Sequence, residues 1–190
     1  MNLRIIHIPT SETEEVRVEY VPSERLDQRL SELCRGYFQV VPMDNDTCLW
    51  LNEEGKIHGL PWNPRTQILW DAKYGAGTDI IVGPAVLTGG IGHDGETLGL
   101  NEEQFAGCLE ALGLVHVRVE NTFEDGLEST AEALLPAPSE FDADTLLEWF
   151  TDEVLLVASE AHGSGPTCSS YAKIIGGPAE IIGKSEEYVG

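Results

Sequence analysis

Residues 36–64, GYFQVVPMDNDTCLWLNEEGKIHGLPWNP, decide how the first half of the chain is organised. The aromatic and β-branched residues at 37–41 predict a strand. Pro42 ends that strand, because proline has no N–H to donate to a neighbouring strand. The acidic and amide side chains at 44–46 that follow are typical of a turn. The stretch therefore begins with a strand and a reversal of the chain.

A second reversal is predicted within the same stretch. Residues 47–51 alternate between two faces, and the four residues at 52–55 end in a glycine, as many hairpin turns do. We therefore expect residues 56–60 to return as the partner strand. The Asn-Pro pair at 63–64 is typical of an N-cap and first helical position. The hairpin is interpreted as structural; the loop residues that would instead form a binding edge are Asn52, Trp62 and Asn63.

Two strands and a helix are predicted before this stretch. The apolar run at 3–8 predicts a buried strand, and the alternating run at 15–20 predicts its half-exposed antiparallel partner. Ser23 is expected to cap a helix that ends at Gly36, where a positive φ is easiest for glycine. The apolar stripe of this helix consists of Leu26, Leu30, Leu33 and Cys34. Its arginines, Arg25, Arg29 and Arg35, are expected to pair with Glu19, Glu24 or Glu32 rather than to bind a ligand.

The middle of the chain predicts a central strand, a loop and a second helix. The apolar run at 79–87 indicates the strand, which the Gly-Pro pair at 83–84 interrupts. The glycine-rich loop at 88–99 has no lysine or arginine and carries carboxylates, so we interpret it as a surface loop rather than a phosphate site. Residues 101–113 predict a helix with a capping box at its start. Residues 114–119 predict another strand.

The second half gives weaker signals. Residues 121–140 are acidic and contain two prolines, so we expect a connector or an interaction arm, with at most a short helix at 128–135. Residues 141–157 predict a helix capped by an aspartate, although 153–158 is equally compatible with a strand. A closing hairpin is predicted at 171–182, around Gly176-Gly177-Pro178.

Several motifs occur in a fixed order over residues 1–112. They are Gly36-Tyr37, Val40-Val41-Pro42, Asn52-Glu53-Glu54-Gly55-Lys56, Gly59-Leu60-Pro61 followed by Asn63, and DIIVGPAVL at 79–87. This series resembles an uncharacterised family, a domain of unknown function in short proteins of bacteriophages and mobile elements. The resemblance implies a phage or mobile-element source and brings no activity, cofactor or catalytic residue. The chain departs from the family by continuing to Gly190.

The chain is strongly acidic, and its charge is uneven. It holds 11 Lys and Arg against 33 Asp and Glu, a formal net charge of −22. Residues 101–160 contain 15 acidic residues and one basic residue, Arg118. Such a field disfavours binding to nucleic acid and anionic membranes, and it attracts basic surfaces. Three explanations compete: adaptation to high salt, a solubilising field without a target, and mimicry of DNA by carboxylates that replace phosphates.

The composition and the spacing of residues argue against several other classes of protein. A chain of 190 residues suffices for one domain or two small lobes. No apolar run approaches the roughly 18 residues of a membrane span, and no signal peptide is visible, so we expect a cytoplasmic protein. The four scattered cysteines are interpreted as reduced core thiols. The sequence shows no metal-ligand spacing and no nucleophile elbow. A catalytic dyad of Cys168 and His162 would form only if folding brought the two side chains together. We expect no cofactor.

We predict an α+β protein in which a mixed or antiparallel sheet packs against a few helices. Residues 1–113 form the first lobe, and residues 114–190 form a smaller acidic lobe. The favoured function is non-enzymatic: a phage or mobile-element accessory protein that binds a basic host protein, with a DNA-mimicking inhibitor of host defence as its specific form. The carboxylates expected to contact the partner are Glu120, Glu124, Asp125, Glu128, Glu132, Asp142, Asp144, Glu148, Asp152 and Glu153.

Two alternatives belong to other functional classes. The first is a small-molecule-binding protein or enzyme with its site between the lobes. The residues expected near that site are Trp62, His93, Asp94 and His162. The second is a structural or oligomerisation module in which tryptophans cover an interface. Those tryptophans are Trp50, Trp62, Trp70 and Trp149.

Overall fold

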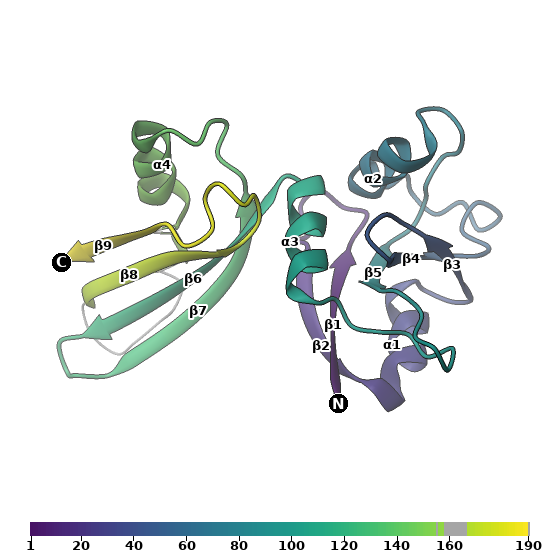
Figure 1. The fold of residues 1–190 in the computed structure, drawn as a ribbon, viewed down its shortest axis with the longest axis horizontal. Coiled ribbons are helices and arrows are strands. Elements are labelled where there is room, and N and C mark those ends of the chain that lie inside the picture. The colour runs from purple at the N-terminus through teal and green to yellow at the C-terminus, as the bar shows by residue number, and fades with distance from the viewer. Residues whose placement is uncertain (155, 158–166, 190) are drawn as a thin grey trace. The chain divides into compact units, whose positions relative to one another are not determined.

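The computed structural model describes residues 1–154, 156–157 and 167–189 (Figure 1). The chain divides into two compact units, Met1–Leu112 and Gly113–Gly190. Each unit contains one antiparallel sheet with helices packed on it, which confirms the α+β class. Within the described part of the chain, every helix is too short or too polar to cross a membrane.

The first unit is a five-stranded antiparallel sheet in the order β2-β1-β5-β4-β3. Its elements are β1 (Asn2–Ile8), β2 (Arg17–Pro22), the 3-10 turn η1 (Ser23–Arg25), α1 (Leu26–Leu33), β3 (Phe38–Pro42), β4 (Thr47–Asn52), α2 (Pro64–Tyr74), β5 (Ala85–Gly89) and α3 (Glu102–Ala111). The helix α1 packs with Val86 of β5 in one core cluster. The next residue, Leu87, faces α2 and α3, because successive strand side chains point to opposite faces. Helices therefore cover both faces of this sheet.

The central strands β4 and β5 are buried along their whole length. The alternation expected for residues 47–51 is therefore wrong, because a strand covered on both sides has no solvent face. Trp50 lies on the α1 side, 8% exposed, and its indole Nε1 donates to Thr88 Oγ1 at 2.9 Å. The polar groups that the central strands bury are thus hydrogen-bonded, as in the Trp50–Thr88 pair.

The hairpin of the first unit joins β3 and β4, with Val40 opposite Trp50. Its turn at 44–46 was predicted, and Asn45 and Asp46 both adopt positive φ, 54° and 53°. Asn and Asp tolerate that conformation better than most residues. The partner strand predicted at 56–60 is wrong. Residues 53–59 form successive turns instead, in which His58 N donates to Glu54 O at 2.9 Å.

Helix starts in this unit test the capping predictions. Asn63 Oδ1 accepts Thr66 N at 3.0 Å and caps α2, with Pro64 as its first residue. Asn101 and Gln104 form the capping box of α3. Ser23 does not cap α1, because it lies in η1 and makes no side-chain cap bond. The left-handed residue that ends α1 is Arg35, with φ 61°, immediately before Gly36.

The second unit is a four-stranded antiparallel sheet in the order β7-β6-β8-β9. Its elements are β6 (Leu114–Phe123), β7 (Glu128–Pro136), α4 (Ala143–Trp149), the π-helical turn η2 (Phe150–Val154), β8 (Thr167–Gly176) and β9 (Ser185–Val189). Residues 128–135 are therefore a strand, so the connector with a short helix is wrong. The closing hairpin returns at 185–189, not at 179–182, because Gly183 N and Ile174 O, 2.9 Å apart, hold residues 177–184 as a loop.

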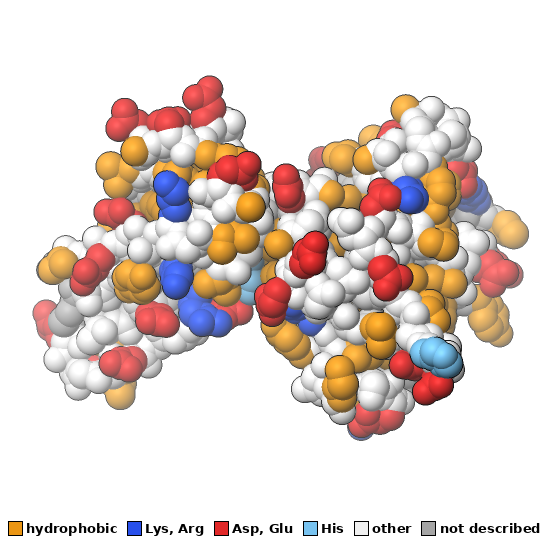
Figure 2. All heavy atoms as spheres, viewed as in Figure 1, with side chains coloured by type: hydrophobic (Ala, Val, Ile, Leu, Met, Phe, Trp, Pro, Cys, Tyr) orange, Lys and Arg blue, Asp and Glu red, His pale blue; other side chains and the backbone are white. Residues whose placement is uncertain are grey.

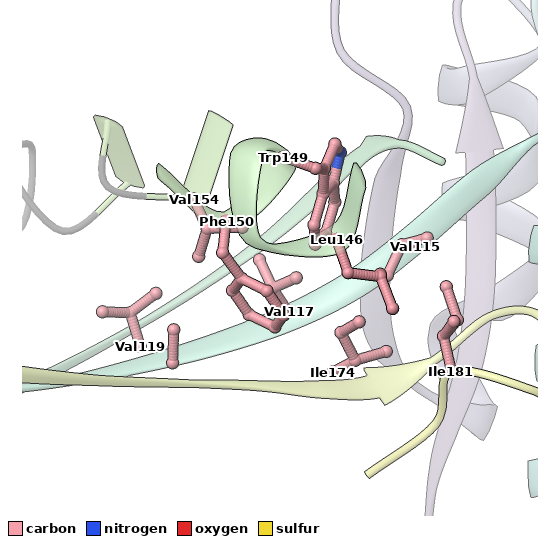
Figure 3. Close-up of a cluster of buried hydrophobic side chains, with 10 residues drawn as sticks. Val115, Val117, Val119, Leu146, Trp149, Phe150, Val154, Ile174 and Ile181 are labelled. Carbon is pink, nitrogen blue, oxygen red and sulfur yellow. The ribbon is translucent and has the colours of Figure 1, made fainter. Parts of the chain in front are cut away.

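The helix α4 and the turn η2 close the core of the second unit. Leu146, Trp149, Phe150 and Val154 point from α4 and η2 onto Val115, Val117 and Val119 of β6 and Ile174 of β8 (Figure 3). Trp149 and Phe150 meet edge to face, with ring centroids 5.3 Å apart. The other side of β6 carries Arg118 and Glu120, both exposed. This sheet is thus buried on the side that faces α4.

Candidate functional site

The carboxylates predicted to bind a partner all lie in the second unit, and the strands place three of them. The odd-numbered residues of β6 from Val115 to Phe123 are buried. Because successive strand side chains point to opposite faces, its even-numbered residues lie on the face opposite α4. Glu120 is on that face, opposite Thr130 of β7. On the neighbouring strand β7, Glu132 lies opposite Arg118 and Glu128 lies opposite Thr122, on the same face of the sheet.

Glu132 is already engaged within its own sheet. Its Oε1 accepts Arg118 Nη2 at 2.7 Å and Arg118 Nε at 2.8 Å. Its Oε2 lies 3.1 Å from Nε2 of the buried His116. A carboxylate that is already paired with an arginine on the neighbouring strand is less available for an ion pair with a partner protein than an unpaired carboxylate. Glu132 therefore stabilises the pairing of β6 with β7.

Two more of the predicted carboxylates occupy the turn between β6 and β7. Glu124 and Asp125 precede Gly126, which adopts φ 79°. Asp125 Oδ1 accepts Leu127 N at 3.1 Å and so closes the turn. These two residues lie at the tip of the hairpin, apart from the rows on the sheet.

The remaining five predicted carboxylates belong to α4 and η2. Asp142 is the N-cap: its Oδ1 accepts Asp144 N at 3.0 Å and Thr145 N at 3.1 Å. The Thr145 hydroxyl, followed by these backbone bonds, lowers the pKa of Asp142. The carboxylates without a side-chain partner among the described residues are Asp144, Glu148, Asp152 and Glu153. Figure 2 shows acidic side chains gathered over α4.

The structure therefore does not bring the ten carboxylates together. The helix layer and the far face of the sheet lie on opposite sides of the β6 core residues, and the turn lies at the end of the hairpin. Asp144, Glu148 and Asp152 are the group that does share one surface. Asp144 and Glu148 lie four residues apart on α4, which places them on successive turns of one side. Asp152 follows four residues later in the turn η2, and all three are exposed.

The two alternative sites receive little support from the described residues. His93 Nδ1 lies 3.5 Å from Asp94 Oδ1, but both side chains are fully exposed. His162 lies outside the described residues, as does the side chain of Cys168. Of the four tryptophans, Trp50 and Trp149 lie in the cores of their units, 8% and 7% exposed. The four therefore do not form one interface.

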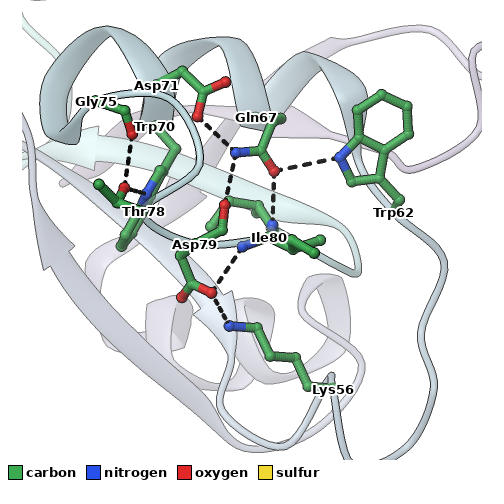
Figure 4. A network of polar contacts seen from close by, with 10 residues as sticks. Lys56, Trp62, Gln67, Trp70, Asp71, Gly75, Thr78, Asp79 and Ile80 are labelled. Carbon is green, nitrogen blue, oxygen red and sulfur yellow. Dashed lines mark hydrogen bonds and ion pairs between the residues drawn. The ribbon is translucent and has the colours of Figure 1, made fainter.

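A polar network around Gln67 explains why residues 79–82 are not part of β5. Gln67 Nε2 donates to Asp79 O at 3.0 Å and to Asp71 Oδ1 at 2.8 Å, and its Oε1 accepts Ile81 N at 2.9 Å (Figure 4). These bonds satisfy backbone groups that a strand would give to its neighbour. The strand predicted at 79–87 is therefore correct only from Ala85, after the break at 83–84. No sequence pattern had indicated this role for Gln67.

Of the three arginines predicted to pair internally, Arg29 is the one that forms ion pairs within the described part of the chain. Arg29 Nε and Nη2 each lie 2.7 Å from the carboxylate of Glu19, and Nη1 lies 3.0 Å from Glu32 Oε2. The hydrogen bonds that Arg29 donates to Glu19 raise the pKa of Arg29, and the bond that it donates to Glu32 lowers the pKa of Glu32. This arrangement ties β2 to α1.

The glycines of the loop at 88–99 serve close packing. A Cβ at Gly90 would lie 2.3 Å from Asp46 Oδ1, and one at Gly89 would lie 2.5 Å from Gly99 O. The Asp46 carboxylate at this point would repel a phosphate. The loop is therefore built to let chain segments approach each other.

The described part of the chain shows neither a reactive thiol nor a group of metal ligands. Burial raises the pKa of Cys34 to about 12 and that of Cys108 to about 11, which keeps both thiols protonated and unreactive. Among the described residues, no three of His, Cys, Asp and Glu are grouped as metal ligands.

Comparison with known proteins identifies a family for the first unit. No curated protein and no solved structure shows significant similarity to the chain. A family model described as a domain of unknown function, DUF3846, matches residues 3–113. The match covers more than half of the chain and bears out the resemblance to an uncharacterised family. The chain thus belongs to the DUF3846 family.

Proposed function

We propose that this protein is a phage or mobile-element accessory protein that acts in the cytoplasm of its bacterial host by binding a basic host protein. The observation that carries the proposal is the outer side of α4 and η2. There Asp144, Glu148 and Asp152 are exposed and unpaired among the described residues. Residues 143–154 contain no lysine or arginine that could neutralise them.

The spacing of these carboxylates indicates the kind of partner that would fit. A helix rises about 1.5 Å per residue, so neighbours four residues apart are separated by about 6 Å along the axis. Like charges at this spacing destabilise a helix by roughly 0.2–0.5 kcal/mol per pair. A partner that presents lysines or arginines every second residue of an extended segment, about 6.6 Å apart, would relieve that repulsion and form three ion pairs.

DNA mimicry receives less support than general recognition of a basic protein. Duplex DNA carries one negative charge per roughly 1.7 Å of axis. The α4 surface carries one per about 6 Å, so it lacks the charge density of the duplex. Leu147, 52% exposed on the same helix, adds an apolar contact that DNA does not offer. We therefore propose ion-pair recognition around an apolar contact as the main mode of binding.

The test is affinity capture from a bacterial lysate with the complete chain at low and high salt. The triple variant Asp144→Asn, Glu148→Gln, Asp152→Asn removes the proposed surface. A matched control, Glu53→Gln, Glu103→Gln, Glu110→Gln, removes the same charge from exposed positions of the first unit. We expect one basic partner to bind the wild type and the control, and to be lost with the triple variant or at high salt.

The same capture experiment distinguishes the specific form of the proposal. If the captured partner is displaced by duplex DNA, its DNA-binding surface is occupied and the protein acts as a mimic. If DNA does not displace it, the partner is recognised at another basic surface. Binding that survives both the triple variant and high salt would contradict the proposal, as would recovery of no basic protein at low salt.

A further inference from the structure

A pocket of about 190 Å³, partly open to solvent, lies in the first unit between α2, α3 and the sheet. Leu69 and Ala72 line it from α2, Gly107 and Cys108 from α3, and Leu87 from β5. Met43, next to the β3–β4 turn, also lines it. The cavity is thus a pocket with apolar walls within the family domain.

The polar side chains around this pocket other than Asn45 are already paired. Asp44 accepts Lys73 Nζ at 2.6 Å, and Thr47 Oγ1 donates to Asp44 O at 2.7 Å. Gln104 Nε2 donates to Asp46 O at 2.8 Å, while its Oε1 accepts a backbone N–H at 3.0 Å. A charged ligand would find no free counter-charge here and would lose its hydration. A neutral ligand loses far less hydration free energy than an ion, so the paired charges of the pocket favour a neutral occupant.

Size and lining atoms narrow the class of occupant. An apolar protein cavity of about 150 Å³ is known to hold one benzene molecule, so 190 Å³ accommodates one six-membered ring with a small substituent. Two sulfur-containing residues, Met43 and Cys108, line the pocket, and sulfur makes favourable contacts with aromatic rings. The lining therefore favours an aromatic ring over an aliphatic one.

Gly107 keeps this space open. It lies within α3, where glycine is less favourable than alanine. A Cβ at this position would meet only Asn45 Nδ2, at 3.7 Å, so alanine would fit without a clash. The same contact places the exposed Asn45 amide beside the pocket. That amide makes no side-chain hydrogen bond among the described residues, and it would suit a hydroxyl group on the ring.

We propose that this pocket binds a neutral monocyclic aromatic small molecule of the phenol class. The ring would lie between Leu69 and Leu87 against the two sulfur atoms, and the hydroxyl would face Asn45. This site is independent of the acidic surface of α4, so the triple variant of that surface should bind the ring as the wild type does.

The experiment is an NMR titration of the complete chain with phenol, followed through the methyl signals of Leu69 and Leu87. We expect saturable shifts at millimolar phenol in the wild type. Gly107→Leu should fill the pocket and weaken binding at least tenfold, and Ala72→Leu fills it from the opposite wall should the first variant fail to fold. The matched control, Glu110→Leu, changes an exposed position of the same helix and should bind as the wild type does.

Three outcomes would overturn the proposal. One is the absence of saturable shifts with phenol. Another is equal binding of cyclohexanol, which would show that the pocket does not select an aromatic ring. The third is binding of the peptide acetyl-Lys-Phe-Lys-amide at least tenfold more tightly than phenol, which would assign the pocket to a side chain of a protein partner. Phenol binding that exceeds both probes and is lost in the filled variants supports the proposal.

Discussion

The two units solve the problem of covering a sheet in different ways. In the first unit α1 lies against one face, and α2 and α3 lie against the other, so β4 and β5 are buried along their whole length. In the second unit α4 and η2 cover one face, and β6 alternates between buried and exposed residues. The number of covered faces therefore decides the sequence pattern that a strand shows.

The same difference decides where charge can be placed. Residues 113–190 hold 3 Lys and Arg against 15 Asp and Glu, whereas the longer segment 1–112 holds 8 against 18. A sheet with a face opposite its helix layer has room for charged side chains such as Arg118 and Glu120, both exposed. The acidic character of the chain is therefore densest in the unit whose described residues place helix on one face of the sheet.

The largest expected loss of stability comes from removing the buried phenyl ring of Phe150 from the helix layer of the second unit. Phe150 is 3% exposed and packs against Trp149 and β6. Phe150→Ala should destabilise the second unit by about 3–5 kcal/mol, because it removes buried surface and leaves a cavity. Amide hydrogen exchange, read separately for each unit, measures the loss.

The control for this change lies in the same helix. Leu147 is 52% exposed, so Leu147→Ala should change the free energy of unfolding by no more than about 0.5 kcal/mol. If Phe150→Ala lowers protection equally in the first unit, the two units unfold as one cooperative structure, and the contrast between them does not extend to stability.

A smaller effect is expected from a buried cap in the first unit. Asn63 is 0% exposed. It caps α2 through Thr66 N and donates from Nδ2 to Gly83 O at 3.0 Å and to Ile8 O at 3.3 Å. Asn63→Ala should cost about 2 kcal/mol, because it removes a cap and leaves buried backbone carbonyls unpaired. Urea unfolding followed by hydrogen exchange checks this value.

Asn101→Ala is the matched control for the buried cap. Asn101 caps α3 through Gln104 N at 2.9 Å but is exposed, so water can replace the lost bond and the cost should be about 1 kcal/mol. Equal losses for the two variants would show that burial of the cap contributes nothing, which would contradict the role assigned to Asn63.

Sequence patterns predicted the elements whose signals are local. The cap at 63–64, the capping box at the start of α3 and the stripe of Leu26, Leu30 and Leu33 were all confirmed. Each depends on residues within one or two turns of the same helix. The turn at 44–46 was also confirmed, because Asn and Asp suit its left-handed geometry.

The errors occurred where distant contacts decide the structure. Residues 56–60 have strand-like content, yet turns hold them. Residues 79–82 are apolar, but their backbone groups pair with Gln67 of α2, and no periodicity reveals such a partner. The strand β7 was missed because its acidic and small residues match an exposed edge strand as well as a loop or short helix.

The candidate surface was predicted only in part. Charge counting singled out the acidic segment, but it could not separate the cap Asp142 and the cross-strand partner Glu132 from the unpaired Asp144 and Glu148. Those roles depend on strand register and helix phase. The pocket beside Gly107 gave no sequence signal, because a glycine inside a helix has several explanations.

The smallest expected effect is a pH dependence that belongs to the first unit. His7 lies on β1 opposite Arg17, and its buried Nε2 makes no hydrogen bond within the described chain. Burial lowers the pKa of His7, an effect that Glu19 and Glu14 partly oppose and that Arg29 and Arg17 reinforce. The folded state therefore binds fewer protons than the unfolded state below pH 6.5, and stability should fall as the pH drops from 6.5 towards the lower folded value.

The free energy of unfolding at pH 7.5 and at pH 5.5 measures this effect, because most carboxylates titrate below that window. His7→Gln removes the titrating group and should reduce the difference between the two values. His93→Gln replaces a fully exposed histidine and should leave the difference as it is in the wild type. An unchanged difference in His7→Gln, or a loss of protection confined to the second unit, would show that the acid sensitivity does not come from the sheet covered on both faces.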